Sequence, residues 1–447
     1  MMKKHAQIYT AGTLRYTARA VFWLFFWMLL GSFVFSMLER IIPILLPLTF
    51  KQFGCSNQTI GLLVGSLPSA LNILVNPGIS FKSDRLRSKW GRRIPFLVSA
   101  TPFAAIFLML IGWAPLLGEW ISGILNGIFP PHTAGLALLI FFCICFQLFY
   151  MVVGSVFYYL FADVVPMQLM GKFFAFFTLT GSAAGWLFQS YFLKYAENYA
   201  EILYTAIALL YGVFFLLMCT QVREGEYPPP DDGQAPPGLS QNIRTYFREC
   251  FSIPYYLWFF AATALNAVSG ICGTLFGVFF ARETLGLTLE TLGKINGWSA
   301  LIGVLISFPC GYWADKFHPL RLYTLSVILV IGVNVMGYFY AYDMFSYVVT
   351  ALSLAIVYTI QATCTLPMFA ALLPRERYGQ FCSAQAIFAA FWLTVANWGG
   401  GWFIDATGDY RNIFIWDIFF TVGALIALIP VSRTWQQCGG KTNYIAP

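Results

Sequence analysis

Twelve stretches of about 20 or more predominantly apolar residues follow one another along this chain of 447 residues. A helix of roughly 20 apolar residues crosses a bilayer, and it satisfies its own backbone hydrogen bonds there. The sequence therefore predicts an all-α polytopic membrane protein with twelve transmembrane helices. The expected spans are residues 20–48, 58–81, 94–114, 134–161, 173–194, 202–220, 252–281, 291–314, 322–341, 346–372, 382–404 and 412–431.

The composition excludes several other classes of protein. Hydrophobic residues make up 59% of the chain and charged residues only 10%, which is far from a soluble domain. We find no phosphate-binding loop, no dinucleotide fingerprint and no Ser-His-Asp arrangement, so we expect neither an ATP-driven pump nor an enzyme. The ten cysteines and three histidines lack zinc-ligand spacing. We therefore expect no cofactor and no metal site.

The basic residues are distributed very unevenly. With the N-terminus placed inside, twenty of the 26 Lys and Arg residues fall in inner segments and five in outer ones, and Arg40 lies within the first span. Cytoplasmic loops of membrane proteins carry such an excess. Both termini are therefore expected in the cytoplasm. The net charge of +7 is explained by insertion, and with no nucleic-acid-binding motif we expect no nucleic acid partner.

The chain divides into two halves with matching loops. A polar, Pro-rich linker, residues 222–250, separates six spans in residues 1–221 from six in residues 251–447. ADVVPMQLMGKF after the fourth span and AALLPRERYGQF after the tenth have the same spacing from Pro to Gly. A charged loop follows the second span and another, GYWADKFHPLR, follows the eighth. Two six-helix pseudo-repeats with matched loops are typical of a secondary transporter.

The first charged loop carries a specific motif. Residues 82–93, KSDRLRSKWGRR, contain a dense run of Lys and Arg residues and one acid. The loop resembles the inner-loop signature of the major facilitator superfamily, Gly-x-x-x-Asp-(Arg/Lys)-x-Gly-(Arg/Lys)-(Arg/Lys), with Ser80 in the place of the first Gly. Its longer form, and GWFIDATGDYRNIF before the last span, are similar to the glycoside–pentoside–hexuronide:cation symporters and the sucrose-transporter branch.

The resemblance implies a gating role for this loop. In the family the Asp, here Asp84, contacts the N-terminus of the eleventh helix, where the helix dipole favours an anion. Arg85 or Arg92 is expected to reach Asp163, and Gly91 to allow a tight backbone turn. Such contacts close the inner side in one state and break when the halves rock. The alternative is that these are ordinary solvated loop charges.

The second half offers a counterpart. Asp315, Lys316 and Arg321 are expected to pair with Arg375 or Glu376.

Polar and aromatic residues near the middle of spans are the candidate solute contacts. Amides exchange hydrogen bonds with hydroxyl groups, and aromatic faces stack on sugar rings. Helix–helix hydrogen bonding in lipid is the alternative for each amide. The candidates are Asn72, Gln147, Tyr150, Asn266, Tyr358, Gln361, Gln385, Trp392 and Asn397.

Charge within a span is rarer. Glu39 and Arg40 lie in the first span, and a carboxylate beside a fixed cation can exchange a proton as access alternates. A structural ion pair is the alternative, and Asp417 is a second, weaker candidate. The melibiose-type sodium symporters carry Asp where this chain has Asn72 and Asn76, so H⁺ is favoured over Na⁺ as the coupling cation.

These observations favour a cation-coupled symporter of a sugar or glycoside, acting as a monomer in the plasma membrane. A facilitator or exporter of another small organic solute is the main alternative. A membrane enzyme or lipid scramblase would need a catalytic cluster. A transport-like sensor would need a large soluble output domain, and the terminal segments of this chain are short.

The charge bias makes the topology testable. A reporter fused at Gly118 should read outside, and one at Gln234 should read inside, because the Lys and Arg excess holds the inner loops in the cytoplasm. Cleavage at residue 234 by a protease added to the outer face of intact cells would contradict this orientation.

Overall fold

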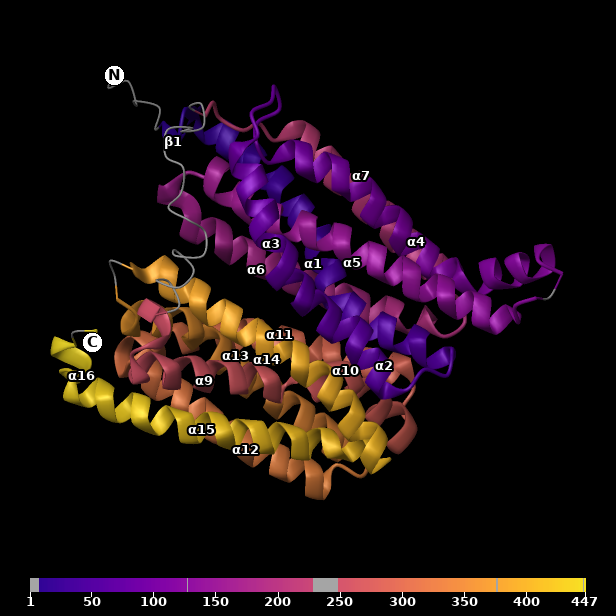
Figure 1. Cartoon of the computed structure of the whole chain (residues 1–447). Coiled ribbons are helices and arrows are strands. Elements are labelled where there is room, and N and C mark those ends of the chain that lie inside the picture. Colours follow the sequence, from indigo (N-terminus) through magenta and orange to yellow (C-terminus); the bar gives the residue numbers. More distant parts are fainter. Residues whose placement is uncertain (1–7, 127, 228–247, 375–376, 445) are drawn as a thin grey trace. The chain divides into compact units, whose positions relative to one another are not determined.

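A computed structural model describes residues 8–126, 128–227, 248–374, 377–444 and 446–447, and most of them are helical (Figure 1). Eleven helical segments among the described residues are long and apolar enough to cross a membrane. The predicted all-α membrane protein is therefore confirmed.

The expected spans appear in order along the chain. Those before the linker are α1 (Ala18–Gln52), α2–η1–α3 (Asn57–Ile60, Gly61–Ser66, Leu67–Arg85), α4 (Ile94–Ile124), α5 (Pro131–Val164), α6 (Met170–Leu187) and α7 (Ala200–Gln221). Those after it are α9–α10 (Pro254–Ser269, Ile271–Phe279), α11 (Leu289–Phe317), α12 (Pro319–Tyr340), α13 (Met344–Leu372), α14 (Tyr378–Thr407) and α15 (Ile413–Gln437).

The helix α6 occupies the place of the fifth predicted span, but it is not among the eleven segments. It has 18 residues, and Lys172, two threonines and three glycines lower its mean hydropathy. The helical path continues through a π-helix (η3, Phe188–Phe192) and a 3-10 turn (η4, Leu193–Ala196).

The described residues form two compact units. The first contains the chain as far as Gly54 and the stretch from Leu71 to Tyr227, and the second contains Cys55–Ala70 and the residues from Arg248 onward. The second span is therefore shared: α2 and the π-helix η1 pack against α14 in the second unit, and α3 from Leu71 belongs to the first.

Within each unit the long helices lie side by side (Figure 1). In the first unit α4 packs against α5 and α7, and α1 against α6 and α7. In the second, α9 packs against α14 and α15, and α13 against α11 and α12. Aromatic side chains fill both interiors, among them the fully buried Phe157 and Phe215 in the first unit and Tyr256 and Tyr323 in the second.

The seventh span is interrupted. α9 ends at Ser269, Gly270 lies between the two pieces, and α10 begins at Ile271. Glycine has no side chain and accommodates an irregular backbone at this point. Gly273 and Gly277 follow at intervals of about one turn on α10. Interrupted helices at membrane depth are tolerated where they line a cavity, and this one does.

A short β-hairpin precedes α1. Its strands β1 (Tyr9–Ala11) and β2 (Leu14–Tyr16) are antiparallel, with Tyr9 opposite Tyr16. The hydroxyl of Thr13, in the turn, accepts a hydrogen bond from the backbone N–H of Glu226 at 2.9 Å. The N-terminal hairpin is thereby tied to the chain that follows α7, within the first unit.

Candidate functional site

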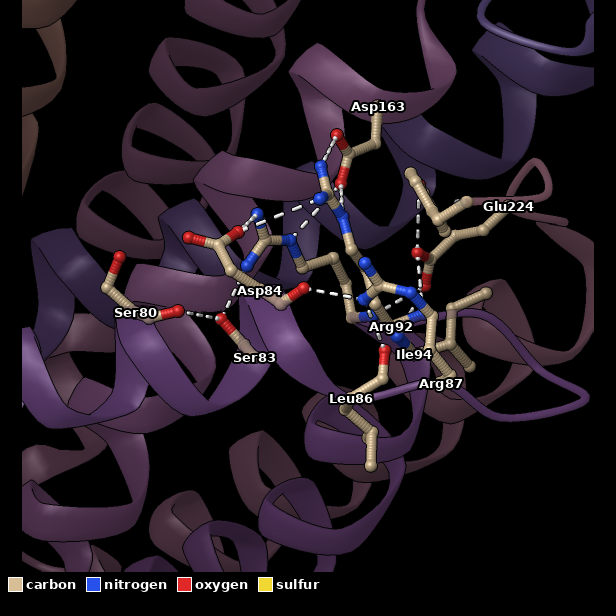
Figure 2. A network of polar contacts seen from close by, with 11 residues as sticks. Ser80, Ser83, Asp84, Leu86, Arg87, Arg92, Ile94, Asp163 and Glu224 are labelled. Atoms are coloured by element: carbon tan, nitrogen blue, oxygen red, sulfur yellow. Dashed lines mark hydrogen bonds and ion pairs between the residues drawn. The ribbon is translucent and has the colours of Figure 1, made fainter. Parts of the chain in front are cut away.

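The charged loop after α3 is the centre of a compact polar network, which Figure 2 shows. The Arg92 guanidinium donates two hydrogen bonds to the Asp163 carboxylate, from Nη2 to Oδ1 at 2.6 Å and from Nε to Oδ2 at 3.0 Å. This bidentate geometry gives the strongest kind of side-chain ion pair. The expected contact between Arg92 and Asp163 is present. Arg85 lies elsewhere, over the ring of Phe81.

Arg93 has the most buried charged side chain of the network. Its side chain is 6% exposed, and it donates to Asp163 Oδ2 at 3.1 Å, to Ser83 Oγ at 2.5 Å and to the Asp84 carboxylate. Two guanidinium groups therefore share Asp163, and Arg93 connects that carboxylate to Asp84. Arg93 is not among the residues predicted from the sequence, although the signature motif ends on two basic residues.

Glu224 caps the N-terminus of α4. Its carboxylate accepts hydrogen bonds from the backbone N–H groups of Arg92, Arg93 and Ile94 at 2.9, 2.8 and 2.7 Å. A carboxylate at this position satisfies unpaired helix donors and favours the positive end of the helix dipole. Sequence reasoning missed Glu224, because it lies in a segment assigned to the linker.

Two features complete this corner of the network. The Tyr227 hydroxyl donates to Glu224 Oε2 at 3.1 Å, and the Arg92 guanidinium lies 4.1 Å from the centre of the Tyr227 ring. Burial and the Glu224 carboxylate raise the pKa of Tyr227, so its hydroxyl stays protonated and remains a donor.

Gly91 makes the turn possible. Its φ is +98°, in the region that favours glycine, and a Cβ atom there would lie 2.5 Å from Glu224 Cδ. The expectation of a tight backbone at Gly91 is confirmed, and the structure adds the reason that the Glu224 side chain fills the space.

Asp84 has its partners in its own unit. Besides Arg93, it lies 3.8 Å from Arg92 Nη1. The expected contact of Asp84 with the eleventh span joins the two units and stays a prediction.

The matching loop of the second unit is built differently. The Arg321 guanidinium lies over the Trp435 ring at 5.5 Å, and the Lys316 carbonyl accepts from Lys441 Nζ at 2.6 Å. Burial, with Arg321 and Lys441 beside it, lowers the pKa of His318, whose Nδ1 accepts from the Leu320 N–H. The predicted partners Arg375 and Glu376, and the side chain of Asp315, lie outside the described part of the chain.

Three of the predicted solute contacts meet in one cavity of the second unit. Gln361 Nε2 donates to Asn266 Oδ1 at 2.8 Å, and both amides and Tyr358 line a cavity of about 460 Å³. Asp417, the weaker candidate for coupling, lies in the same wall. The broken seventh span contributes Gly270, Gly273, Thr274 and Gly277 to the lining.

The other three candidates of the second unit lie on α14. Gln385 Nε2 donates to Thr263 Oγ1 at 3.2 Å, and Asn397 Nδ2 donates to the Leu393 carbonyl at 2.7 Å. Trp392 is exposed and packs edge-on against Phe388 and Phe391.

The candidates of the first unit lie on α3 and α5. Tyr150 is stacked between Phe35 and Phe146 with ring centres 5.4 Å apart on each side, and its buried hydroxyl has no hydrogen-bond partner among the described residues. Gln147 is buried and its Nε2 lies 3.6 Å from Cys143 Sγ. Asn72 Oδ1 accepts from Asn76 Nδ2 at 2.9 Å.

Glu39 and Arg40 lie within α1, which continues to Gln52 as expected. The Tyr158 hydroxyl donates to Glu39 Oε1 at 3.2 Å. Gly185 on α6 makes room for Arg40, since a Cβ atom there would lie 2.5 Å from Arg40 Cδ. Both residues are exposed within the part of the chain that the structure describes.

A second carboxylate contact, in the second unit, was also missed. Asp405 Oδ1 accepts from the backbone N–H and the amide of Asn57 at 3.1 and 2.8 Å, and Oδ2 accepts from the Gln58 N–H at 2.8 Å. The backbones of the second span and α14 also approach closely beside this contact. A Cβ atom on Gly401 would lie 2.2 Å from the carbonyl oxygen of Asn57, and a Cβ atom on Gly61 would lie 2.1 Å from the carbonyl oxygen of Asn397. Asp405 stands in the GWFIDATGDYRNIF motif, which was the available signal.

A family model described as MFS/sugar transport protein matches residues 28–403. The chain belongs to this family. The match covers most of both halves, and the predicted resemblance to the major facilitator superfamily is thereby confirmed.

Solved structures of major facilitator transporters share the fold. A D-xylose-proton symporter is 16% identical, with 92% of this chain and 97% of that chain covered and a TM-score of 0.63. The nucleoside transporter NupG is 14% identical, with 92% and 99% covered and a TM-score of 0.64. A bacterial homologue of the human lysosomal transporter Spinster is 12% identical, with 92% and 94% covered and a TM-score of 0.61. This MFS transporter therefore has the fold of proteins that carry different solutes.

The network around Asp163 predicts a large effect of one neutral substitution. Asp163→Asn should lower the free energy of unfolding by about 3 kcal/mol, because it leaves two partly buried guanidinium groups without their shared carboxylate. Denaturation of the purified protein in detergent measures the change.

The matched control is Glu290→Gln. It breaks an exposed ion pair with Lys294, 2.8 Å long and four residues away on the same helix, and should cost about 0.5 kcal/mol or less. Equal stabilities of the two variants would contradict a structural role for the Asp163 network.

Gly91 gives an independent prediction. Gly91→Ala should destabilise the protein by about 1–3 kcal/mol, because the backbone is in the left-handed region and the new methyl group meets Glu224. Gly171→Ala, on α6, is the control: a Cβ atom added there would have no other atom within 4 Å, and alanine favours a helix over glycine. A Gly91→Ala protein as stable as the Gly171→Ala protein would show that the turn tolerates a side chain.

Proposed function

We propose that this transporter is a proton-coupled symporter of a sugar or glycoside that works by alternating access. The observation that carries the proposal is the cavity of the second unit, where Asn266, Tyr358 and Gln361 meet. A volume of about 460 Å³ lies within the usual range of small-molecule sites. The amides supply donors and acceptors for hydroxyl groups, and the family description names sugar transport.

Further solute contacts are proposed on both units. Tyr150 corresponds to Tyr358 in the repeat. Its buried hydroxyl has no hydrogen-bond partner among the described residues, which supports a role in binding. Asn72, Gln147, Gln385 and Trp392 are the remaining candidates. Asn397 is the exception, because its side chain lies against the position of Gly65 and supports the alternative of helix packing.

Coupling is assigned to Glu39, with Arg40 as the cation that tunes it. The hydrogen bond from Tyr158 stabilises the charged carboxylate of Glu39. In the bilayer, loss of water from the surroundings favours the protonated, neutral carboxyl group over the charged one. Alternation between wet and dry surroundings would thus load and release a proton.

Gating is assigned to the two carboxylate contacts that lie toward opposite ends of the second span. Asp84, at the end of α3, belongs to the Arg92–Arg93–Asp163 network, and we propose that it also holds α14 in one state. At the other end of the second span, Asp405 on α14 accepts hydrogen bonds from the first turn of α2. In alternating access one contact forms as the other opens. Lys316, Arg321, Asp315 and Glu376 are the proposed counterparts in the second half.

We further propose that both termini are cytoplasmic, that the chain resides in the plasma membrane and that it acts as a monomer. A facilitator or exporter of another small organic solute is the alternative. Uptake of a panel of labelled sugars into proteoliposomes, with and without an imposed pH gradient, separates the two. Accumulation of no sugar with the gradient present would contradict the symport proposal.

Glu39 yields the sharpest transport prediction. Glu39→Gln should abolish uphill accumulation under a pH gradient and keep equilibrium exchange, because the neutral amide resembles the protonated carboxyl group. Glu119→Gln, which neutralises an exposed carboxylate on α4, is the matched control and should accumulate solute as the unmodified protein does. If the Glu39→Gln protein accumulates solute as the control does, Glu39 has only a structural role.

A further inference from the structure

The cavity of the second unit contains a carboxylate, the weaker coupling candidate of the sequence, to which the proposed function assigns no role. Asp417 is the fifth residue of α15, lines the cavity and is 5% exposed. Most buried charges in proteins are paired, since an isolated one loses its hydration. No ion pair of Asp417 occurs within the described ranges, whereas Asp163 has two.

Hydroxyl groups are its direct partners. The Tyr358 hydroxyl donates to Oδ2 at 2.5 Å and the Thr421 hydroxyl donates to Oδ1 at 2.8 Å. The Ser269 hydroxyl and the Asn334 amide also donate hydrogen bonds to the Asp417 side chain. These neutral donors offset part of the cost of a buried negative charge, but they supply no positive charge. A cation or a proton must therefore accompany the carboxylate when the cavity is closed to water.

Among the described residues, the elements packed around Asp417 offer few other titratable groups. They are the Cys272 thiol of α10 and the Tyr347 and Tyr358 hydroxyls of α13; α12 contributes the neutral amide of Asn334. The cation of the adjoining turn, Arg411, is engaged elsewhere: it donates to the carbonyls of Tyr338 and Ala341, both at 2.9 Å, and lies over the Tyr342 ring.

A proton suits this surrounding better than a sodium ion. Both carboxylate oxygens already accept a hydroxyl hydrogen, and the nearby Asn266 oxygen is occupied by Gln361. Hard metal cations need several free oxygen ligands. No group of three or more His, Cys, Asp or Glu side chains suited to a metal ion occurs in the described part of the chain.

The position of Tyr358 connects the carboxylate to the cavity. Its hydroxyl donates to Asp417 and also belongs to the wall that carries Asn266 and Gln361. Protonation of the carboxyl group weakens it as an acceptor, which releases the Tyr358 hydroxyl toward a solute. Two ligands that compete for or share one such group have coupled affinities.

We propose that Asp417 is a second proton-binding site of this transporter, separate from Glu39, and that Tyr358 links its protonation to occupancy of the cavity in the second unit. The link to occupancy rests on the proposed function; the proton site itself does not.

Infrared difference spectroscopy of the full-length protein in lipid tests the site without any solute. Stepping the pH should reveal a protonated carboxyl band that is lost in Asp417→Asn and kept in Glu39→Gln. A titrating carboxyl band of full size in Asp417→Asn would overturn the proposal. Loss of the band on adding NaCl at fixed pH would overturn it in favour of a sodium site.

A milder pair of variants decides the matter where Asp417→Asn does not fold. Tyr358→Phe should move the midpoint of the band upward by about one pH unit, because the charged carboxylate loses a donor. Tyr347→Phe removes a hydroxyl from the same cavity wall and should leave the midpoint in place. Identical midpoints in the two variants would overturn the assignment.

Discussion

Lipid offers no hydrogen bonds to a polypeptide backbone, and this constraint determines most of the structure described above. Each span must satisfy its own N–H and C=O groups, so the chain is helical wherever it crosses the bilayer. Departures from regular helix are correspondingly informative. The break at Gly270 opens directly onto the cavity that holds Asn266, Gln361 and Asp417. Irregular backbone and polar side chains thus occur at the same place.

The charged network of the first unit, around Arg92 and Arg93, holds the ends of several helices together. Arg92 and Arg93 are held by Asp163 and Asp84, while their backbone N–H groups are held by Glu224. Different carboxylates therefore hold the side chains and the backbone of the same two residues. The network therefore ties together the ends of α3, α4 and α5 and the chain that follows α7.

The sequence predicted the parts of this protein that depend on local pattern. Hydropathy located the spans. The signature loop indicated Gly91 and left Arg85 or Arg92 as the partner of Asp163, of which Arg92 makes the contact. What it missed depends on tertiary contact. Glu224 follows a helix end by three residues and looks like linker until the fold brings it against α4. Asp417 is the weaker candidate in the sequence because it lies near the end of a span, and the sequence does not show that a cavity lies beside it. The exposure of Glu39 depends on neighbouring helices, which the sequence of one span does not reveal.

The π-helix η1 has a consequence for the geometry of the second span. A π turn adds one residue to the helix, and each residue of an α-helix advances the side chains by about 100° around the axis. Side chains after Ser66 consequently point in directions that an uninterrupted helix would not give them. The inserted residue changes the helical phase between Asn57 and Gly61, which lie against α14, and the residues from Leu71 onward, which belong to the first unit. One membrane span thus contributes residues to both units of the protein.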